Sequence, residues 1–144
     1  MSALLPTEIR PGLVVHFDGD ELHAHEAVTC EGGWAPKLRP YVCLKGGIRP
    51  VWTPLTGSGR DERLEVVREW RTGGLWPWRE RDNYLQDGAR VVTGPPSAFV
   101  ALSCHEETEY VNRARVTAAG LAAILREREE RLARLARFRQ RQAA

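Results

Sequence analysis

The chain has no long hydrophobic run, no paired cysteine motif and almost no lysine. None of its apolar stretches approaches the roughly 20 residues that cross a bilayer, so we expect no membrane-spanning helix. The N-terminal residues lack a basic region followed by a long apolar core, so we expect no signal peptide. The cysteines stand far apart, at Cys30, Cys43 and Cys104. An odd number of isolated cysteines indicates reduced thiols and a cytosolic protein.

Several common functional motifs are also missing from the sequence. It contains no Walker loop, dinucleotide-binding fingerprint, Gly-x-Ser-x-Gly elbow or zinc-finger spacing. The absence of these motifs argues against the nucleotide-dependent and serine-hydrolase classes that carry them, and we expect no cofactor.

Lysine is scarce because 19 of the 21 basic residues are arginine. The segment from Thr117 to Ala144 carries seven arginines and three glutamates, whereas residues 1–116 hold fourteen bases and sixteen acids. The body is therefore nearly neutral and the tail is basic. Arginine is the better bidentate ligand for phosphate, although a GC-rich genome also favours arginine codons, and both explanations stay open.

Short apolar runs between prolines and glycines predict a β-rich domain of ordinary size. We expect strands over residues 13–17, 41–44, 49–55, 64–70, 89–93, 98–102 and 110–116, and a short strand or hairpin within 21–33, after a polar turn at 18–20. Thr117 is an expected N-cap for one helix from Ala118 to about Arg139. Pro54 requires an edge position or a bulge, because proline cannot donate to a ladder.

These elements predict a mainly β, α+β fold, in which a small, strongly bent antiparallel sheet or barrel carries one long C-terminal helix. We expect residues 1–127 to form a single domain that includes the first turns of the helix. Residues 128–144 are expected to form a basic helical extension or a frayed tail. Arg128 and Arg131 interrupt the apolar stripe of the helix, which predicts that its distal half projects.

Two segments in the first half of the chain carry the clearest functional signal. Arg39-Pro40-Tyr41-Val42-Cys43-Leu44 is an apolar run that opens with an arginine. Val51-Trp52-Thr53-Pro54-Leu55-Thr56-Gly57-Ser58-Gly59-Arg60 is a strand that ends in a turn rich in hydroxyls and glycine. An arginine and a threonine at the ends of adjacent strands can lie side by side and bind one phosphate, which RNA cleavage without a metal requires.

The order of these segments resembles the MazF/PemK family of toxin endoribonucleases. That family has an opening strand after a glycine, a mobile loop, an Arg-Pro before apolar residues, and a strand ending in Pro-x-Thr. Residues 12–17, the loop 18–38, Arg39-Pro40 and Pro54-Leu55-Thr56 follow this order. The likeness is tight over about residues 11–17 and 39–58 and loose from 60 to 116.

The resemblance implies a homodimeric SH3-like barrel that cleaves single-stranded RNA to a 2′,3′-cyclic phosphate and is inhibited by a cognate antitoxin. It assigns Arg39 as the catalytic arginine and Thr56 as the active-site threonine. Ser58 and Arg60, in the turn after Thr56, are further candidates for RNA contact. A solvated arginine at the start of a strand is the alternative interpretation of Arg39.

The resemblance does not assign a general base. Candidates in the first loop are His23, His25 and Glu26, together with Glu31. His23 and His25 also suggest a metal pair, because residues i and i+2 of a strand face the same way. Cys104-His105 is the only partial second ligand group, and solvated loop histidines are the simpler interpretation.

An aromatic and basic segment lies at 76–81. Trp76, Trp78 and Arg79 are candidates for RNA contact, since bases stack on such rings while arginines hold the backbone. Packing in the core or at a protein interface is the alternative for the tryptophans. The distal arginines of the helix are candidates for RNA phosphates, for an acidic partner or for a soluble tail. The rival to a nuclease is a non-catalytic SH3-like module that binds protein or nucleic acid.

Overall fold

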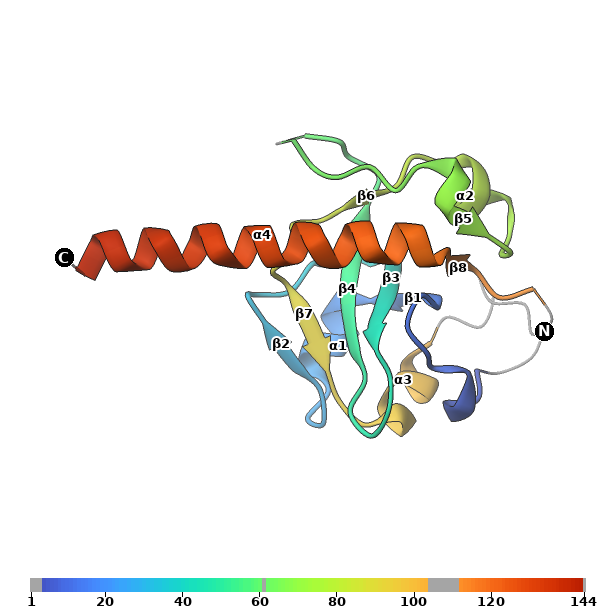
Figure 1. The fold of residues 1–144 in the computed structure, drawn as a ribbon. Coiled ribbons are helices and arrows are strands. Elements are labelled where there is room, and N and C mark those ends of the chain that lie inside the picture. The colour runs from blue at the N-terminus through green and yellow to red at the C-terminus, as the bar shows by residue number, and fades with distance from the viewer. Residues whose placement is uncertain (1–3, 61, 104–111, 144) are drawn as a thin grey trace.

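The computed structural model describes residues 4–60, 62–103 and 112–143. It is an α+β fold in which a six-stranded antiparallel sheet is joined by a long C-terminal helix (Figure 1). The strands are β1 (Val14–Asp18), β2 (Thr29–Glu31), β3 (Leu38–Lys45), β4 (Val51–Thr56), β5 (Arg71–Thr72), β6 (Tyr84–Leu85), β7 (Val91–Thr93) and β8 (Arg115–Val116). The helices are α1 (Gly19–Ala24), α2 (Trp76–Glu80), α3 (Pro96–Leu102) and α4 (Ala118–Ala143), with 3-10 turns η1 (Pro6–Glu8) and η2 (Arg68–Trp70).

The main sheet runs in the order β1-β3-β4-β7-β2, and β6 pairs with a further stretch of β4. The strands predicted over 13–17, 41–44, 49–55 and 89–93 correspond to β1, β3, β4 and β7, so these four predictions are confirmed. β3 and β4 form a hairpin in which Tyr41 lies opposite Pro54. Gly47 lies in its turn with φ of 87°, a conformation that favours glycine. β5 and β8 form a separate two-stranded sheet.

Pro54 lies where β4 changes its neighbour on the side away from β3. β7 pairs with Val51 and Trp52, whereas β6 pairs with Leu55 and Thr56. Pro54 therefore falls between the two ladders, where the missing N–H of proline leaves no bond unmade on that side. β4 is therefore a central strand and not the edge strand that is one of the two expectations for Pro54, and a local gap between two ladders accommodates the proline instead.

The strand predicted over 98–102 is wrong, because these residues belong to α3. Pro96 stands in the first turn of α3, where the missing N–H of a proline costs nothing and its fixed φ favours a helix. Ala98 and Phe99 bury their side chains against the sheet from that helix. A short apolar run does not by itself distinguish a buried strand from a buried helix.

The polar turn expected at 18–20 is the start of α1. The Asp18 carboxylate accepts the backbone N–H groups of Asp20 at 2.9 Å and Glu21 at 3.3 Å, which caps the helix. Within 21–33 the structure therefore has the end of α1 and the short strand β2.

Residues 64–70 are also not a strand. They contain one isolated bridge, between Glu65 and Tyr84, followed by η2. Of the strand expected over 110–116, Arg115 and Val116 form β8, and residues 110–111 lie outside the described part of the chain.

The main sheet buries side chains on both of its faces. One face carries Phe17, Tyr41 and Trp52, whose rings meet edge-on with Phe17 at the centre, and it packs against α1 and α3. The other face carries Val42 and Leu55 and packs against α2 and α4. Because both faces are covered, the central strands are continuously apolar. Each large apolar side chain that is fully buried there contributes roughly 1.5–3 kcal/mol to the stability of the fold.

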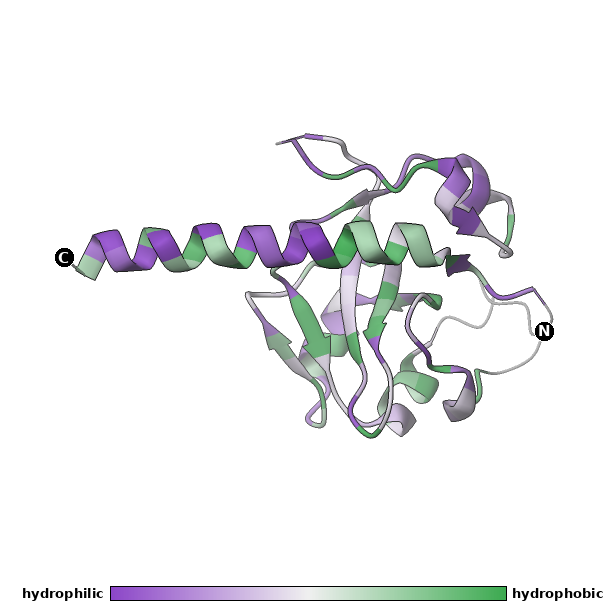
Figure 2. Cartoon of the chain, in the orientation of Figure 1, coloured by the Kyte–Doolittle hydropathy of each residue, from purple (hydrophilic) through white to green (hydrophobic). Residues whose placement is uncertain are grey.

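Helix α4 begins as predicted and continues to Ala143. Thr117 is its N-cap, since the Thr117 hydroxyl accepts the backbone N–H of Gly120 at 3.1 Å. Gly120 lies so close to Trp70 that a Cβ there would meet the Trp70 Cβ at 2.7 Å, which lets the helix pack tightly on η2. Ile124 is fully buried, whereas residues 129–134 and 136–143 are exposed. The distal half therefore projects beyond the sheet, and its colouring is largely hydrophilic (Figures 1 and 2).

No helix among the described residues is long and apolar enough to cross a membrane.

An ion pair between Glu8 and Arg113 ties η1 to the segment before β8. The Arg113 Nε donates to Glu8 Oε2 at 2.8 Å and Nη2 donates to Oε1 at 3.0 Å, and both side chains are largely buried. The hydrogen bond from Arg113 lowers the pKa of Glu8 below its usual value of 4.5, although burial opposes that shift. A lowered carboxyl pKa stabilises the fold above the unfolded-state pKa, and this contribution disappears as the pH falls through the folded-state pKa.

We expect Glu8→Gln to lower the free energy of unfolding by about 3 kcal/mol near neutral pH, because it removes the carboxylate that pairs with the largely buried Arg113 guanidinium. The difference from wild type should shrink in acid, at a pH below the folded-state pKa of Glu8, because protonation then removes the Glu8 charge from the wild-type protein as well. Urea denaturation at both pH values measures it. Glu21→Gln, an exposed carboxylate in α1, is the control. Equal destabilisation at both pH values would contradict the role of this pair.

Candidate functional site

A cleft of about 450 Å³ opens beside the ends of β3 and β4. Arg39 lines it from β3 and Thr56 lines it from the end of β4. His16 lines it from β1, and residues 77–78 and 81–83 supply the opposite wall. The two residues singled out by the family resemblance therefore lie in one cleft, although 16 residues of sequence separate them.

The antiparallel register explains why Arg39 and Thr56 meet. Tyr41 pairs with Pro54 across β3 and β4. Extending the same register by two residues sets Arg39 opposite Thr56, since side chains two apart along a strand share a face. On the other side of β3, Phe17 pairs with Arg39 and His16 pairs with Pro40, so His16 enters the cleft from the opposite face of the sheet to Arg39. The ends of three adjacent strands thus contribute to one cleft.

Neutral acceptors hold the Arg39 guanidinium in place. Its Nε and Nη2 donate to the Pro36 carbonyl at 3.1 and 2.7 Å, and its Nη1 donates to Gln86 Oε1 at 2.8 Å. These bonds use three of the five N–H groups of an arginine. Because no carboxylate is among these acceptors, the positive charge is oriented but not neutralised. Burial lowers the pKa of Arg39, and the nearby charges of Arg90 and Arg63 lower it further.

Thr56 retains its hydroxyl proton for a ligand. Its Oγ1 accepts a long hydrogen bond, 3.4 Å, from the backbone N–H of Ser58, and a hydroxyl that accepts one bond can still donate. The turn after Thr56 packs against Tyr84, since a Cβ on Gly59 would meet that ring at 2.7 Å. Glycine at this position therefore lets the turn lie close to β6.

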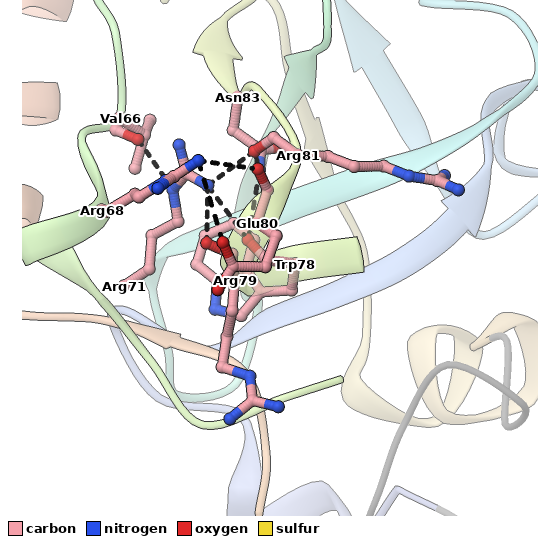
Figure 3. A network of polar contacts seen from close by, with 8 residues as sticks. All are labelled: Val66, Arg68, Arg71, Trp78, Arg79, Glu80, Arg81 and Asn83. Atoms are coloured by element: carbon pink, nitrogen blue, oxygen red, sulfur yellow. Dashed lines mark hydrogen bonds and ion pairs between the residues drawn. The ribbon is translucent and has the colours of Figure 1, made fainter. Parts of the chain in front are cut away.

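A buried arginine holds the wall of the cleft opposite Thr56. The Arg71 Nε donates to the Val66 carbonyl at 2.8 Å, and its Nη1 donates to the carbonyls of Arg81, Trp78 and Arg79 at 2.6, 3.2 and 3.2 Å (Figure 3). Asn83, also buried, donates from Nδ2 to the carbonyl of Arg81 at 3.1 Å. One guanidinium thus satisfies four carbonyls and fixes the path of α2 and the residues after it.

The aromatic segment divides between the core and the surface. Trp78 is 3% exposed and donates its indole N–H to the Thr72 carbonyl at 3.2 Å, which favours the packing interpretation for this ring. Trp76 is 57% exposed, and the Arg81 guanidinium lies 5.5 Å from its ring centroid. Arg79 is exposed and its side chain points away from the network (Figure 3). Arg81, rather than Arg79, lines the cleft.

The remaining candidate residues do not line this cleft. Ser58 is half-buried in the turn, and Arg60 is exposed beyond it. His23 stacks on Trp34 with ring centroids 3.6 Å apart, and His25 accepts the Ala27 backbone N–H through Nδ1 at 3.1 Å. Glu26 is exposed near the end of α1. The structure therefore does not bring the three proposed bases to Arg39.

The premise of the metal alternative is also wrong. His23 lies in α1 and His25 is its C-cap, so the two are not on one face of a strand. Among the described residues there is no group of three or more His, Cys, Asp and Glu side chains able to hold a metal ion. Cys104 and His105 lie outside the described residues. Cys30 and Cys43 are free thiols.

Sequence reasoning missed three cleft residues that carry proton-transfer or hydrogen-bonding groups, namely His16, Asp82 and Asn83. A signal for His16 was present, because it is the one polar residue inside the apolar run from Leu13 to Phe17. Alternation along β1 places His16 on the opposite face from Val15 and Phe17. Asp82 and Asn83 had no such signal, because the Arg71 contacts that place them are made by backbone carbonyls.

The chain matches no protein-family model, no curated protein and no solved structure in the three comparisons made. The function must therefore be argued from the cleft itself.

We expect Arg71→Met to lower the free energy of unfolding by roughly 3 kcal/mol, because it leaves buried carbonyls without donors. Hydrogen exchange should accelerate at residues 77–83, whose carbonyls lose their common partner. Arg79→Met is the matched control, since that exposed side chain makes no hydrogen bond or ion pair within the described structure, and it should change stability by less than about 0.5 kcal/mol. Equal effects of the two variants would contradict a structural role for Arg71.

Proposed function

We propose that this protein is a MazF/PemK-like endoribonuclease that cleaves single-stranded RNA without a metal and leaves a 2′,3′-cyclic phosphate. The observation that carries the proposal is that Arg39, Thr56 and His16 line one cleft, from three adjacent strands. This arrangement offers a charge for the phosphorane, a hydroxyl donor and a group that accepts a proton. The order of motifs along the sequence supports the same assignment independently.

The proposed reaction uses each of the three side chains once. His16 accepts the proton of the RNA 2′-hydroxyl, and the 2′-oxygen then forms a bond to phosphorus. Arg39 and the Thr56 hydroxyl donate hydrogen bonds to the non-bridging phosphate oxygens as charge develops on them. The bond from phosphorus to the 5′-oxygen breaks, and Arg39 gives that oxygen a proton. Proton exchange with solvent then restores His16 and Arg39.

The neutral acceptors around Arg39 suit this role. A carboxylate partner would compete with the phosphate for the guanidinium, whereas the Pro36 carbonyl and the Gln86 amide only orient it. A donor that is already oriented needs little reorganisation when the transition state forms.

The proposal extends to the assembly that the family resemblance implies. We propose that the protein is cytosolic and forms a homodimer, and that the bent sheet of each subunit forms an SH3-like barrel. We further propose that a cognate antitoxin protein inhibits the nuclease. The antiparallel order of the sheet and its two covered faces support the barrel.

A second candidate function is a non-catalytic SH3-like module that binds protein or nucleic acid. Exposed Trp76 favours it, because a large exposed aromatic ring is a typical feature of recognition surfaces and requires no catalytic group. Under this alternative Trp76→Ala should abolish binding, while Arg39→Ala should leave any effect of expression in cells unchanged. The nuclease should instead be toxic on expression and lose its toxicity with Arg39→Ala.

We expect Arg39→Ala to reduce cleavage of single-stranded RNA in EDTA at least a hundredfold, about 3 kcal/mol of transition-state stabilisation. Arg49→Ala is the matched control, because it removes the same charge from an exposed position at the opposite end of the β3–β4 hairpin. Thermal melts should show that both variants fold. Full activity in Arg39→Ala would refute the assignment, and inactivity of the wild-type protein on varied single-stranded RNAs would favour the binding module.

Within the same assay, His16→Ala should lower kcat by about a hundredfold if His16 is the general base. His25→Ala, which lies outside the cleft, should retain the wild-type rate. Asp82→Asn tests the other group in the cleft that can accept a proton. If Asp82→Asn lost the activity and His16→Ala retained it, the base would be Asp82.

A further inference from the structure

A second cleft runs between α4 and the segments 62–64 and 85–90, with a volume of about 630 Å³. Four arginines line this cleft, which we call the arginine groove: Arg63, Arg90, Arg131 and Arg134. We propose that the arginine groove binds the phosphate backbone of the RNA strand next to the cleaved bond. The inference rests on the proposed function for the identity of its ligand, but the groove itself is distinct from the cleft of Arg39.

One face of α4 supplies half of the groove. Arg131 and Arg134 lie four and seven residues after Glu127, so all three side chains project from the same face of the helix. Contacts to the loop between β6 and β7 hold that face in place. The Arg128 Nη1 donates to the Gly88 carbonyl at 2.8 Å, and Gly88, with φ of 73°, would place a Cβ 3.4 Å from the Arg128 Cα.

Gln86 connects the groove to the cleft of Arg39. It lines the groove, and its side-chain Oε1 accepts from Arg39 Nη1 at 2.8 Å. Its backbone carbonyl accepts from Arg63 Nε at 2.9 Å. One glutamine therefore joins the arginine that lines the reaction cleft to an arginine that lines the groove. A strand whose scissile phosphate lies at Arg39 has its neighbouring phosphates close to Arg63.

The charges of the groove favour an anion. Four arginines line it against three acids, Glu62, Asp87 and Glu127. Arg90 and Arg134 each contact one of these acids at 3.4 Å, and such partly exposed pairs contribute little and open readily. Arg63 bonds to carbonyls alone, and Arg131 has no partner in the described structure. A phosphate backbone would relieve the repulsion among Arg39, Arg63 and Arg90.

The lining favours RNA over a protein segment. Protein partners gain most of their affinity from apolar anchors that fill pockets. The groove offers two apolar side chains, Leu64 and Leu85, and Leu85 is 1% exposed. A nucleic-acid backbone needs only guanidinium donors and positive charge, which the groove provides.

The test compares two double variants of full-length protein that remove the same charge from the same helix. Arg131→Gln with Arg134→Gln removes the groove arginines of α4, whereas Arg126→Gln with Arg137→Gln removes two exposed arginines that do not line it. The probe is a fluorescent single-stranded 2′-O-methyl oligonucleotide, which cannot be cleaved because its 2′-oxygens are blocked. Anisotropy measured at several salt concentrations gives the affinity and its salt dependence.

We expect the groove variant to bind the probe about tenfold more weakly, with a salt slope smaller by about 1 to 1.5, and the control variant to change affinity less than threefold. Equal weakening by the two variants would overturn the proposal in favour of diffuse attraction to the tail. No weakening by either variant would also overturn it. If a glutamate-rich peptide bound wild type but not the groove variant, while RNA bound both alike, the groove would be a protein-docking site.

Cleavage assays separate this inference from the proposed function. A dinucleotide is too short to occupy both sites, so the groove variant should cut it at the wild-type rate while losing efficiency on longer RNA. If wild type cleaves, Arg39→Ala does not, and the two double variants bind alike, the groove proposal alone is refuted. If the groove variant binds more weakly but wild type cleaves no RNA, the groove stands and the nuclease assignment falls.

Discussion

The pairing of β3 with β4 is the constraint on which the rest of the structure depends. These strands lie in the middle of the sheet, with apolar side chains on both faces, so a slip of one residue would turn a buried set towards the wrong layer. The register that the core enforces also sets Arg39 opposite Thr56 at the far end of the hairpin from Gly47. The candidate site is therefore positioned by the same contacts that hold the fold together.

Arginine is used throughout this protein as a donor to backbone carbonyls. Arg71 serves four of them from a buried position, Arg39 binds that of Pro36, Arg63 binds those of Ser58 and Gln86, and Arg128 binds that of Gly88. A planar guanidinium with five donors can join distant loops in this way, whereas an ammonium cannot. Because a carbonyl carries no net charge, each bond orients the side chain and leaves its positive charge available. A body that is nearly neutral overall is therefore locally positive around its two clefts.

Under the proposed function, the two clefts have different roles in binding RNA. The cleft of Arg39 combines few groups of different chemistry, which suits a single reacting phosphate. The groove along α4 repeats one group, the guanidinium, which suits a repeating backbone. Gln86 joins the two clefts through one side-chain and one backbone hydrogen bond, so a shift of the segment at 85–90 would move both Arg39 and Arg63. The projecting helix α4 thus contributes Arg131 and Arg134 to the groove, in addition to its few buried turns.

The sequence by itself determined the central strands, the N-cap at Thr117, the long basic helix, and Arg39 and Thr56 as the pair of interest. These features follow from local patterns, since an apolar run, a helix cap and an arginine before a proline can each be recognised within a few residues of sequence. It did not determine that 98–102 is helical, because a short apolar run suits either state. Nor did it place His16 and Asp82 in the same cleft as Arg39, or Gln86 against the Arg39 guanidinium, since these positions come from strand register, from the carbonyls held by Arg71 and from packing on α4. Such long-range contacts depend on which surfaces pack together when the chain folds, and they are therefore seen only in the tertiary structure.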